Sequence, residues 1–328
     1  MGSRVDDIAV ELLDLLRNSP ERYFVVQKLA NKLSTHGRFI NEALRGLAVW
    51  GYKFDFDDKM RVKFVSAPDS IFPHEIHHYL KTKFIGRNII SHFSVPSTNS
   101  LAFSLADEGA AEGTLVIAEK QTSGRGRLGR SWHSPQKTGL WFSLILRPDL
   151  PPAGLPGLSI VTATALAETI ISRLKLQAKI KWPNDCLIDG LKVAGILTEL
   201  SAELDKAKYV IVGTGINVNQ TLRNFPPHLK HKATSLRLET GTEVNRIEFL
   251  ADFLLNFEKM YLQFKKDGLK PLLPKIKKRS SLLGRQVRLK QGKKTIIAKA
   301  IGIGIDGALI VKRRKETLRV TAGEVTVV

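Results

Sequence analysis

The chain has 328 residues, which is long for one domain and enough for two or three. Hydrophobic residues make up 43% and charged residues 25%, a composition typical of globular proteins. No apolar run approaches the roughly 20 residues that cross a bilayer, so the sequence predicts no membrane partner. Cys186 is the only cysteine, which excludes an internal disulfide and a cysteine-based zinc site and favours a reducing, cytoplasmic location.

The net charge of +20 is concentrated near the carboxyl terminus. Residues 1–66 hold 11 Lys and Arg against 9 Asp and Glu, whereas residues 261–328 hold 18 against 4. A basic amino-terminal module for nucleic acids therefore does not explain the charge. The imbalance predicts anionic partners without identifying them.

Three helical apolar stripes and a hairpin pattern in residues 1–66 predict a winged helix-turn-helix domain. The third stripe ends at Gly51, and the alternating segment that follows turns at the charged residues 57–59. A small helical packing or dimerisation domain is the alternative. The apolar positions of the three stripes are Ile8, Leu12, Leu15 and Leu16; Phe24, Val25, Leu29 and Leu33; and Ile40, Leu44, Leu47 and Val49.

Residues 67–80 are predicted to be a linker, 81–270 a central domain, and 271–328 a carboxyl-terminal β-barrel of SH3-like type with five short strands. The central domain has helical patterns at 158–176 and 246–266. Its first two strands are joined by a loop too short for a crossover helix, which predicts antiparallel pairing and an α+β class with a mixed or antiparallel sheet. The strand segments are 114–121, 140–147, 179–182, 192–200 and 208–218.

The segment 124–132, GRGRLGRSW, is the first chemical motif. Its glycines leave backbone N–H groups available to anions, and Arg125, Arg127 and Arg130 can form charge-assisted bonds to phosphate or carboxylate. Trp132 could stack on a purine. The pattern contains GxGxxG, but no βαβ return follows, and a Walker A sequence is absent. A mobile, solvated basic loop is the alternative.

Two further motifs lie at predicted strand ends. In KWPND and the following GLKVAGILTEL, a Trp-Pro corner and a hairpin at Asp189-Gly190 bring Lys181, Asp185 and Lys192 near one end of the sheet. A lysine there can hold a carboxylate and neutralise charge on a phosphate. In GTGINVN, the glycines 213 and 215 let a ligand approach the backbone, and Asn217 can bond a ligand or a phosphate-bound Mg²⁺. A surface lysine and a generic strand-end turn are the alternatives.

Together, GRGRLGRSW, KWPND, GLKVAGILTEL and VGTGINVN resemble the biotin protein ligases in order and spacing. The predicted winged helix and barrel are similar to the terminal domains of the bifunctional ligase/repressor branch. The resemblance covers nearly the whole chain. It implies catalytic roles for Arg125, Arg127 and Lys192.

The resemblance also implies two binding sets and no protein cage for a metal, with Mg²⁺ entering on ATP. The implied biotin-binding residues are Ser97, Thr98, Asn99, Gln121, Gly124, Arg125, Gly126, Arg127, Lys192, Gly213 and Gly215. The implied nucleotide-binding residues are Arg127, Arg130, Trp132, Lys181, Asn184, Asp185 and Asn217.

By the same resemblance, biotin and ATP give biotinyl-5′-AMP and pyrophosphate, and a lysine of the biotin carboxyl carrier domain of acetyl-CoA carboxylase then takes the biotin. The implied partners are that carrier, operator DNA and a second copy of the chain when the adenylate is bound. A lipoate-type ligase and a ligand-sensing regulator without catalysis are the alternatives.

The predicted recognition helix departs from the family pattern. Family repressors usually begin this helix with Ser-Arg, whereas this chain has His36 and Gly37. Phosphate contacts normally supply much of the affinity for DNA, so the loss of this arginine predicts weaker operator binding and leaves the implied catalysis unaffected. The candidate DNA-binding residues are Thr35, His36, Arg38, Asn41 and Arg45.

Overall fold

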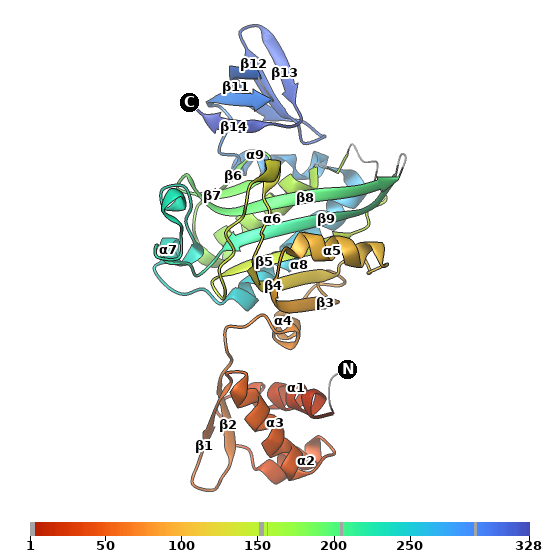
Figure 1. Ribbon diagram of the computed structural model, residues 1–328, viewed down its shortest axis with the longest axis vertical. Coiled ribbons are helices and arrows are strands. Elements are labelled where there is room, and N and C mark those ends of the chain that lie inside the picture. Colours follow the sequence, from red (N-terminus) through yellow and green to blue (C-terminus); the bar gives the residue numbers. More distant parts are fainter. Residues whose placement is uncertain (1–3, 151–153, 156, 204–205, 292–293) are drawn as a thin grey trace. The chain divides into compact units, whose positions relative to one another are not determined.

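The computed structural model describes residues 4–150, 154–155, 157–203, 206–291 and 294–328 (Figure 1). The chain divides into two compact units, Met1–Asp69 and Ser70–Val328. The division falls inside the predicted linker, residues 67–80. From Ser70 on, the chain is part of the larger unit because the helix α4, Pro73–Tyr79, packs against the helix α8, Arg246–Asp267.

The smaller unit contains the predicted order of three helices and a hairpin. Its elements are α1 (Arg4–Arg17), α2 (Val26–Lys32), α3 (Gly37–Val49), β1 (Lys53–Phe56) and β2 (Val62–Ser66), and the two strands are antiparallel. Apolar residues of all three helices and of β2 form one core. The second and third stripes were partly wrong: Phe24 and Val25 lie before α2, where Phe24 bridges Val62 and Val25 is 41% exposed, and Val49 at the end of α3 is 85% exposed. The winged helix-turn-helix assignment stays a prediction.

The larger unit is built on a seven-stranded mixed sheet with the order β3-β4-β5-β9-β8-β7-β6. The predicted antiparallel pairing of β4 with β5 is confirmed. Only β3 with β4 is parallel among these neighbours, and β3 and β7 were not predicted as separate strands. The strands are β3 (Ile89–Val95), β4 (Leu115–Gln121), β5 (Gly139–Leu146), β6 (Ala178–Lys181), β7 (Asp185–Ile188), β8 (Leu191–Glu203) and β9 (Lys206–Asn217).

Helices cover both faces of this sheet (Figure 1). The helix α6, Gly157–Leu174, packs with α8 over the main apolar core, and α5, Thr98–Asp107, packs on β4, β5 and β9 through a separate small core. By length and composition α6 could span a membrane, but two thirds of it is buried in the fold. That burial is what a core helix requires. Two short helices, α7 (Leu236–Thr240) and α9 (Leu273–Arg279), complete the set.

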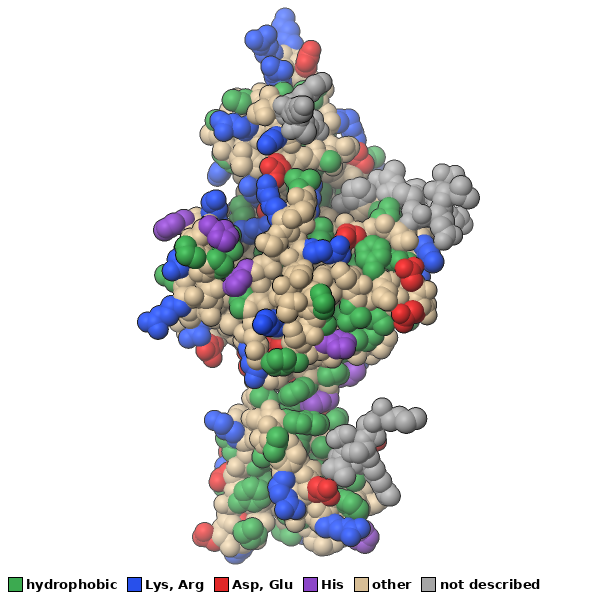
Figure 2. Space-filling model, in the orientation of Figure 1, with side chains coloured by type: hydrophobic (Ala, Val, Ile, Leu, Met, Phe, Trp, Pro, Cys, Tyr) green, Lys and Arg blue, Asp and Glu red, His purple; other side chains and the backbone are tan. Residues whose placement is uncertain are grey.

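The last strands form a five-stranded antiparallel sheet with the order β13-β12-β11-β10-β14. They are β10 (Gln286–Gln291), β11 (Lys294–Ile303), β12 (Leu309–Arg313), β13 (Glu316–Val320) and β14 (Glu324–Val327). In the described residues no pairing joins the outer strands β13 and β14, so the SH3-like barrel stays a prediction. Figure 2 shows Lys and Arg side chains gathered on this sheet, including the exposed turn of residues 312–315.

A buried ion pair connects α8, the strands β4 and β5, and the segment before α4 in the larger unit. Arg246, at the start of α8, is fully buried, and its Nη1 lies 2.8 Å from Glu119 Oε2 of β4. Arg246 Nη1 also donates to the carbonyl of Gly139 in β5 at 2.9 Å, and the N–H of Ile71 donates to Glu119 Oε1 at 3.0 Å. Removing one partner leaves a buried charge without its counterion, which is far costlier than losing an exposed pair.

Glu119→Ala is therefore expected to lower the free energy of unfolding of the larger unit by about 3–5 kcal/mol. Arg173→Ala is the control, since Arg173 pairs with Glu248 at 2.9 Å and with Asp252 at 2.7 Å at the exposed surface, and a loss below about 1 kcal/mol is expected. Urea unfolding followed by tryptophan fluorescence measures both, because Trp132, Trp141 and Trp182 lie in the larger unit. If both variants lost the same free energy of unfolding, the stabilising role of the buried Glu119–Arg246 pair would be contradicted.

Candidate ligand-binding site

The candidate site lies where β4, β8 and β9 meet the start of α5 and the loop 124–132. A small cavity of about 50 Å³ is lined by residues of all these elements. A larger cavity of about 660 Å³ lies beside it and shares Gly126, Arg127, Trp132, Asn184 and Lys192 with it. The site therefore has room for one small buried group and for a larger, more open one.

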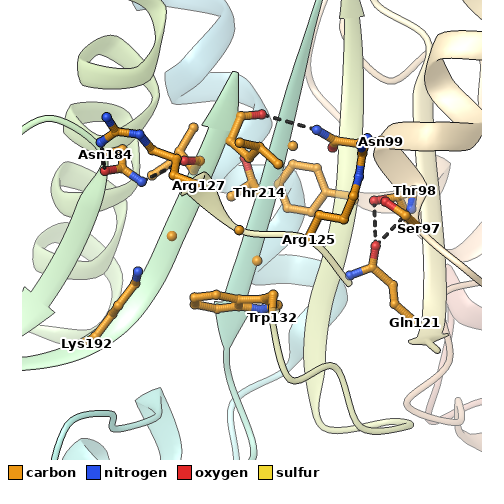
Figure 3. Close-up of a pocket in the computed structure, with 17 residues that line it drawn as sticks. Ser97, Thr98, Asn99, Gln121, Arg125, Arg127, Trp132, Asn184, Lys192 and Thr214 are labelled. Atoms are coloured by element: carbon orange, nitrogen blue, oxygen red, sulfur yellow. Dashed lines mark hydrogen bonds between the residues drawn. The ribbon is translucent and has the colours of Figure 1, made fainter. Parts of the chain in front are cut away.

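One end of the small cavity is lined by neutral polar side chains and by Arg125, whose charge is paired with Glu199 (Figure 3). Gln121 Oε1 accepts from the backbone N–H of Thr98 at 2.8 Å and from its hydroxyl at 3.1 Å. Ser143 Oγ lies 2.8 Å from Thr98 Oγ1 and 2.6 Å from Asn99 Oδ1. Ser97 precedes α5, and its side chain makes no capping bond to that helix. Neutral donors and acceptors held this firmly suit a polar, uncharged ligand group.

The loop 124–132 is a small hairpin. The N–H of Trp132 donates to the carbonyl of Gly124 at 2.8 Å, and the N–H of Gly126 donates to that of Arg130 at 2.6 Å. Leu128 turns the chain with a positive φ of 58° and is exposed. Backbone bonds across its width give the loop a defined shape in this structure.

Each arginine of this hairpin contacts a different element. Arg125 Nη2 lies 2.9 Å from Glu199 Oε2 of β8, and Arg127 Nη1 donates to Asn184 Oδ1 at 2.8 Å. Arg130 pairs with Glu324 of β14. Arg127 is half-buried, and burial lowers the pKa of its guanidinium below the ordinary value, against the opposing effect of Asp185 and Glu324.

Lys192 completes the cationic end of the site. Its Nζ lies 2.7 Å from Asp185 Oδ1 and 5.1 Å from the ring centre of Trp132. The register of β6, β7 and β8 places Lys181 opposite Asp185. The prediction that Lys181, Asp185 and Lys192 lie near one end of the sheet is thereby confirmed.

The glycines of β9 make room for side chains of the site. A Cβ at Gly213 would lie 1.9 Å from Asn99 Oδ1, and one at Gly215 would lie 2.3 Å from Trp132 Nε1. The prediction that a ligand lies directly on these glycines was therefore incomplete, because Asn99 and Trp132 occupy that space. Trp132 Nε1 is buried without a hydrogen-bond partner in the described chain, which leaves a donor for a ligand.

The side chain of Asn217 forms hydrogen bonds within the fold. It is buried, its Nδ2 donates to the carbonyl of Thr234 at 2.9 Å, and its Oδ1 accepts from Gln220 Nε2 at 3.2 Å. These bonds hold the segment after β9 against the sheet. The geometry does not support the predicted Mg²⁺ contact, and no cluster of His, Cys, Asp and Glu suited to a metal occurs in the described residues.

Cys186 takes no part in the chemistry of the site. It is fully buried, and burial raises the pKa of its thiol to about 12. The thiol is therefore protonated at neutral pH and is not a nucleophile.

The structure brings most of the predicted site residues together. Of the predicted biotin-binding set, all but Gly124 line the small cavity, and Gly124 is buried beside it in the hairpin. All seven predicted nucleotide-binding residues line the larger cavity. The predicted DNA-binding residues belong to the smaller unit, at and before α3. The sequence did not predict the wall formed by residues 225–233 and 323–326, which carries no recognisable motif.

Known proteins that are similar to this chain belong to the biotin/lipoate ligase family. Residues 93–217 match the model of the biotin/lipoate A/B protein ligase family. The bifunctional ligase/repressor BirA of Bacillus subtilis (strain 168) is 35% identical over 315 residues, which cover 96% of this chain and 97% of that protein. BirA of Escherichia coli (strain K12) is 31% identical over 219 residues, 67% of each chain.

A solved structure is also similar. The biotin protein ligase from Aquifex aeolicus, in complex with biotin and ATP, aligns with a TM-score of 0.64 and 32% identity over 73% of this chain and 98% of that chain. Since the Bacillus relative is more than 30% identical along almost the whole of both proteins, this chain belongs to the biotin protein ligases of the bifunctional ligase/repressor type.

Proposed function

We propose that this chain activates biotin with ATP and transfers it to a lysine of a biotin carboxyl carrier domain. The observation that carries the proposal is the division of the small cavity into two ends (Figure 3): a hydrogen-bonding end, where the one cation, Arg125, is paired with Glu199, and an end with Arg127 and Lys192. The ureido ring of biotin needs neutral donors and acceptors, such as those of Thr98, Asn99 and Gln121. Its carboxylate needs cations, which Arg127 and Lys192 supply.

In the first step the biotin carboxylate oxygen attacks the α-phosphorus of ATP. The bond from that phosphorus to the bridging oxygen breaks, and pyrophosphate leaves. Lys192 and Arg127 stabilise the negative charge on the transferring group, and Asp185 fixes the Lys192 ammonium at 2.7 Å. The larger cavity beside them is the proposed place of the nucleotide. No described side chain is assigned to Mg²⁺, which is expected to accompany the phosphates of ATP.

In the second step an acceptor lysine amine attacks the acyl carbon of biotinyl-5′-AMP. The bond between that carbon and the phosphate oxygen breaks, AMP leaves, and an amide forms. The hairpin 124–132 shields the mixed anhydride from water before the acceptor arrives. Because the reactants are oriented together, no serine or cysteine nucleophile is required.

Two observations favour this function over its alternatives. A lipoate ligase shares the family model, but the relatives that match most of this chain are named for biotin or as bifunctional BirA. A sensor without catalysis needs a binding pocket but no cluster of cations beside a second cavity. We propose a cytoplasmic setting, where ATP and carrier domains occur.

Lys192→Gln and Arg127→Ala are expected to reduce biotin-dependent exchange of pyrophosphate into ATP by about 100-fold or more, because each removes charge stabilisation from the transition state. Lys208→Gln is the control, because Lys208 is a half-exposed lysine near the start of β9. The exchange activity of this variant is expected to equal that of the unsubstituted protein. Wild-type rates in the first two variants would contradict the assigned roles. Absence of exchange in the unsubstituted protein would refute the ligase activity itself.

We propose a second function, biotin-responsive repression, for the smaller unit. Arg38, Asn41 and Arg45 lie on one exposed face of α3, which follows α2 after a short turn. This placement suits a helix that enters a DNA groove. The Bacillus and Escherichia relatives are named as repressors. Palindromic operators require two-fold symmetry, so we propose that the adenylate-bound chain binds DNA as a homodimer.

A gel-shift experiment with a duplex that carries the promoter of the organism's own biotin-synthesis genes tests this function. Binding is expected with biotin and ATP present, and Arg38→Ala with Arg45→Ala is expected to weaken it about tenfold or more through lost phosphate contacts. Pyrophosphate exchange in this double variant should remain unchanged. Equal binding to an unrelated duplex, or no shift at all, would refute specific repression.

A further inference from the structure

The three arginines of the hairpin and Lys192 line the two cavities, and three of these four cations already face a carboxylate. Arg125 pairs with Glu199, Arg130 with Glu324 and Lys192 with Asp185. Arg127 instead contacts the neutral amide of Asn184. Its positive charge is thus the least compensated of the four by direct partners. The arginines of the hairpin are therefore not equivalent, although they belong to one sequence motif.

Glu199 is the carboxylate that links the hairpin to the polar end of the cavity. Its Oε2 accepts from Arg125 Nη2 at 2.9 Å and from Asn99 Nδ2 at 2.7 Å. Arg125 and Asn99 both line the small cavity, whereas Glu199 does not, and Figure 3 draws these two partners on the same side of it. Asn99 is also fixed by Ser143, whose Oγ lies 2.6 Å from Asn99 Oδ1. One oxygen of Glu199 therefore orients both the hairpin and the second residue of α5.

We propose that Glu199 is a positioning residue of the ligase reaction, which holds the hairpin 124–132 against α5 over the bound ligand. This inference rests on the proposed function of the cavity and assigns a different role to each of two arginines. Arg125 anchors the hairpin through Glu199, which balances its charge. Arg127 is the hairpin arginine whose charge is left to stabilise phosphate.

Glu199 affects the reaction in two ways, through Arg125 and through Asn99. Without the ion pair to Arg125, the hairpin opens more often and biotinyl-5′-AMP escapes to solvent faster. Without the hydrogen bond from Asn99, the polar end loses its arrangement and biotin binds less tightly. Glu199→Gln separates the two effects, because its amide oxygen still accepts from Asn99 but carries no charge for Arg125. Glu199→Ala removes both.

The test measures three quantities in the full chain: the KM for biotin in pyrophosphate exchange, its kcat, and the rate at which biotinyl-5′-AMP appears in solution. For Glu199→Gln we expect release about fivefold faster and a KM within about twofold of the unsubstituted value, as for loss of one half-exposed ion pair. For Glu199→Ala we expect both release and KM to rise about tenfold. If the substitutions only destabilised the fold, Glu199→Gln would not raise the release rate of biotinyl-5′-AMP while leaving the KM for biotin nearly unchanged.

Two further variants make the test specific. Glu168→Gln is the matched control, since Glu168 pairs with Arg279 at 2.6 Å away from the cavity, and all three quantities should stay unchanged. Arg125→Ala combined with Glu199→Ala should accelerate release no more than the stronger single variant, because the residues act as a pair. Arg127→Ala should lower kcat in addition to the effect of Glu199→Ala.

Several results would overturn the proposal. Unchanged release and KM in Glu199→Ala, with exchange abolished in Lys192→Gln, would refute the role of Glu199 and leave the ligase function intact. Additive effects of Arg125→Ala and Glu199→Ala on release would refute the pairing. Absence of exchange in the unsubstituted protein would refute the positioning role together with the ligase function.

Discussion

The site depends on the close approach of two side chains to the bare backbone of β9. Asn99 and Trp132 lie where Cβ atoms of residues 213 and 215 would be, and a Cβ at Gly195 in the neighbouring strand would lie 2.9 Å from the Trp132 ring. Alanine at either position of β9 would overlap these side chains by more than an ångström. The small cavity, its hydrogen-bonding end and the unpartnered indole N–H all follow from this contact. The glycines of GTGIN thus shape the pocket through their neighbours.

Charge imposes the second constraint on the site. Cations brought near one another need counterions or a bound anion, since an unpaired buried charge is costly. The chain meets this need with Asp185, Glu199 and Glu324, which come from β7, β8 and β14. Only Arg127 has a neutral side-chain partner among these four contacts, and it is half-buried. An anionic ligand would therefore relieve the unpaired charge at this position most.

Local sequence patterns predicted the elements whose patterns are strong. The strands β4, β5, β8 and β9 are apolar and are bounded by turns with glycine or charged residues, so the sequence predicted them. The site was predictable because its motifs lie at the ends of these strands. The strand β3 was missed because His92, Phe93 and Ser94 are all exposed, which removes the alternation that marks a strand. The helix α5 was missed although Ser97-Thr98-Asn99 was recognised at its start. The partner Glu199 was missed because its contact with Arg125, 74 residues earlier, depends on the register of the sheet.

The strength of the contacts on the hairpin suits the proposed opening of this loop in each reaction cycle. Exposed ion pairs contribute only about 0–1 kcal/mol, and the Arg125 and Arg130 side chains are 43% and 69% exposed. Such pairs hold the hairpin in place without preventing its release, whereas a buried pair like that of Glu119 and Arg246 would lock it. The chain therefore uses its buried ion pair where α8 must stay fixed to the sheet. It uses exposed pairs at the hairpin, where the proposed mechanism has biotin enter and the adenylate meet its acceptor.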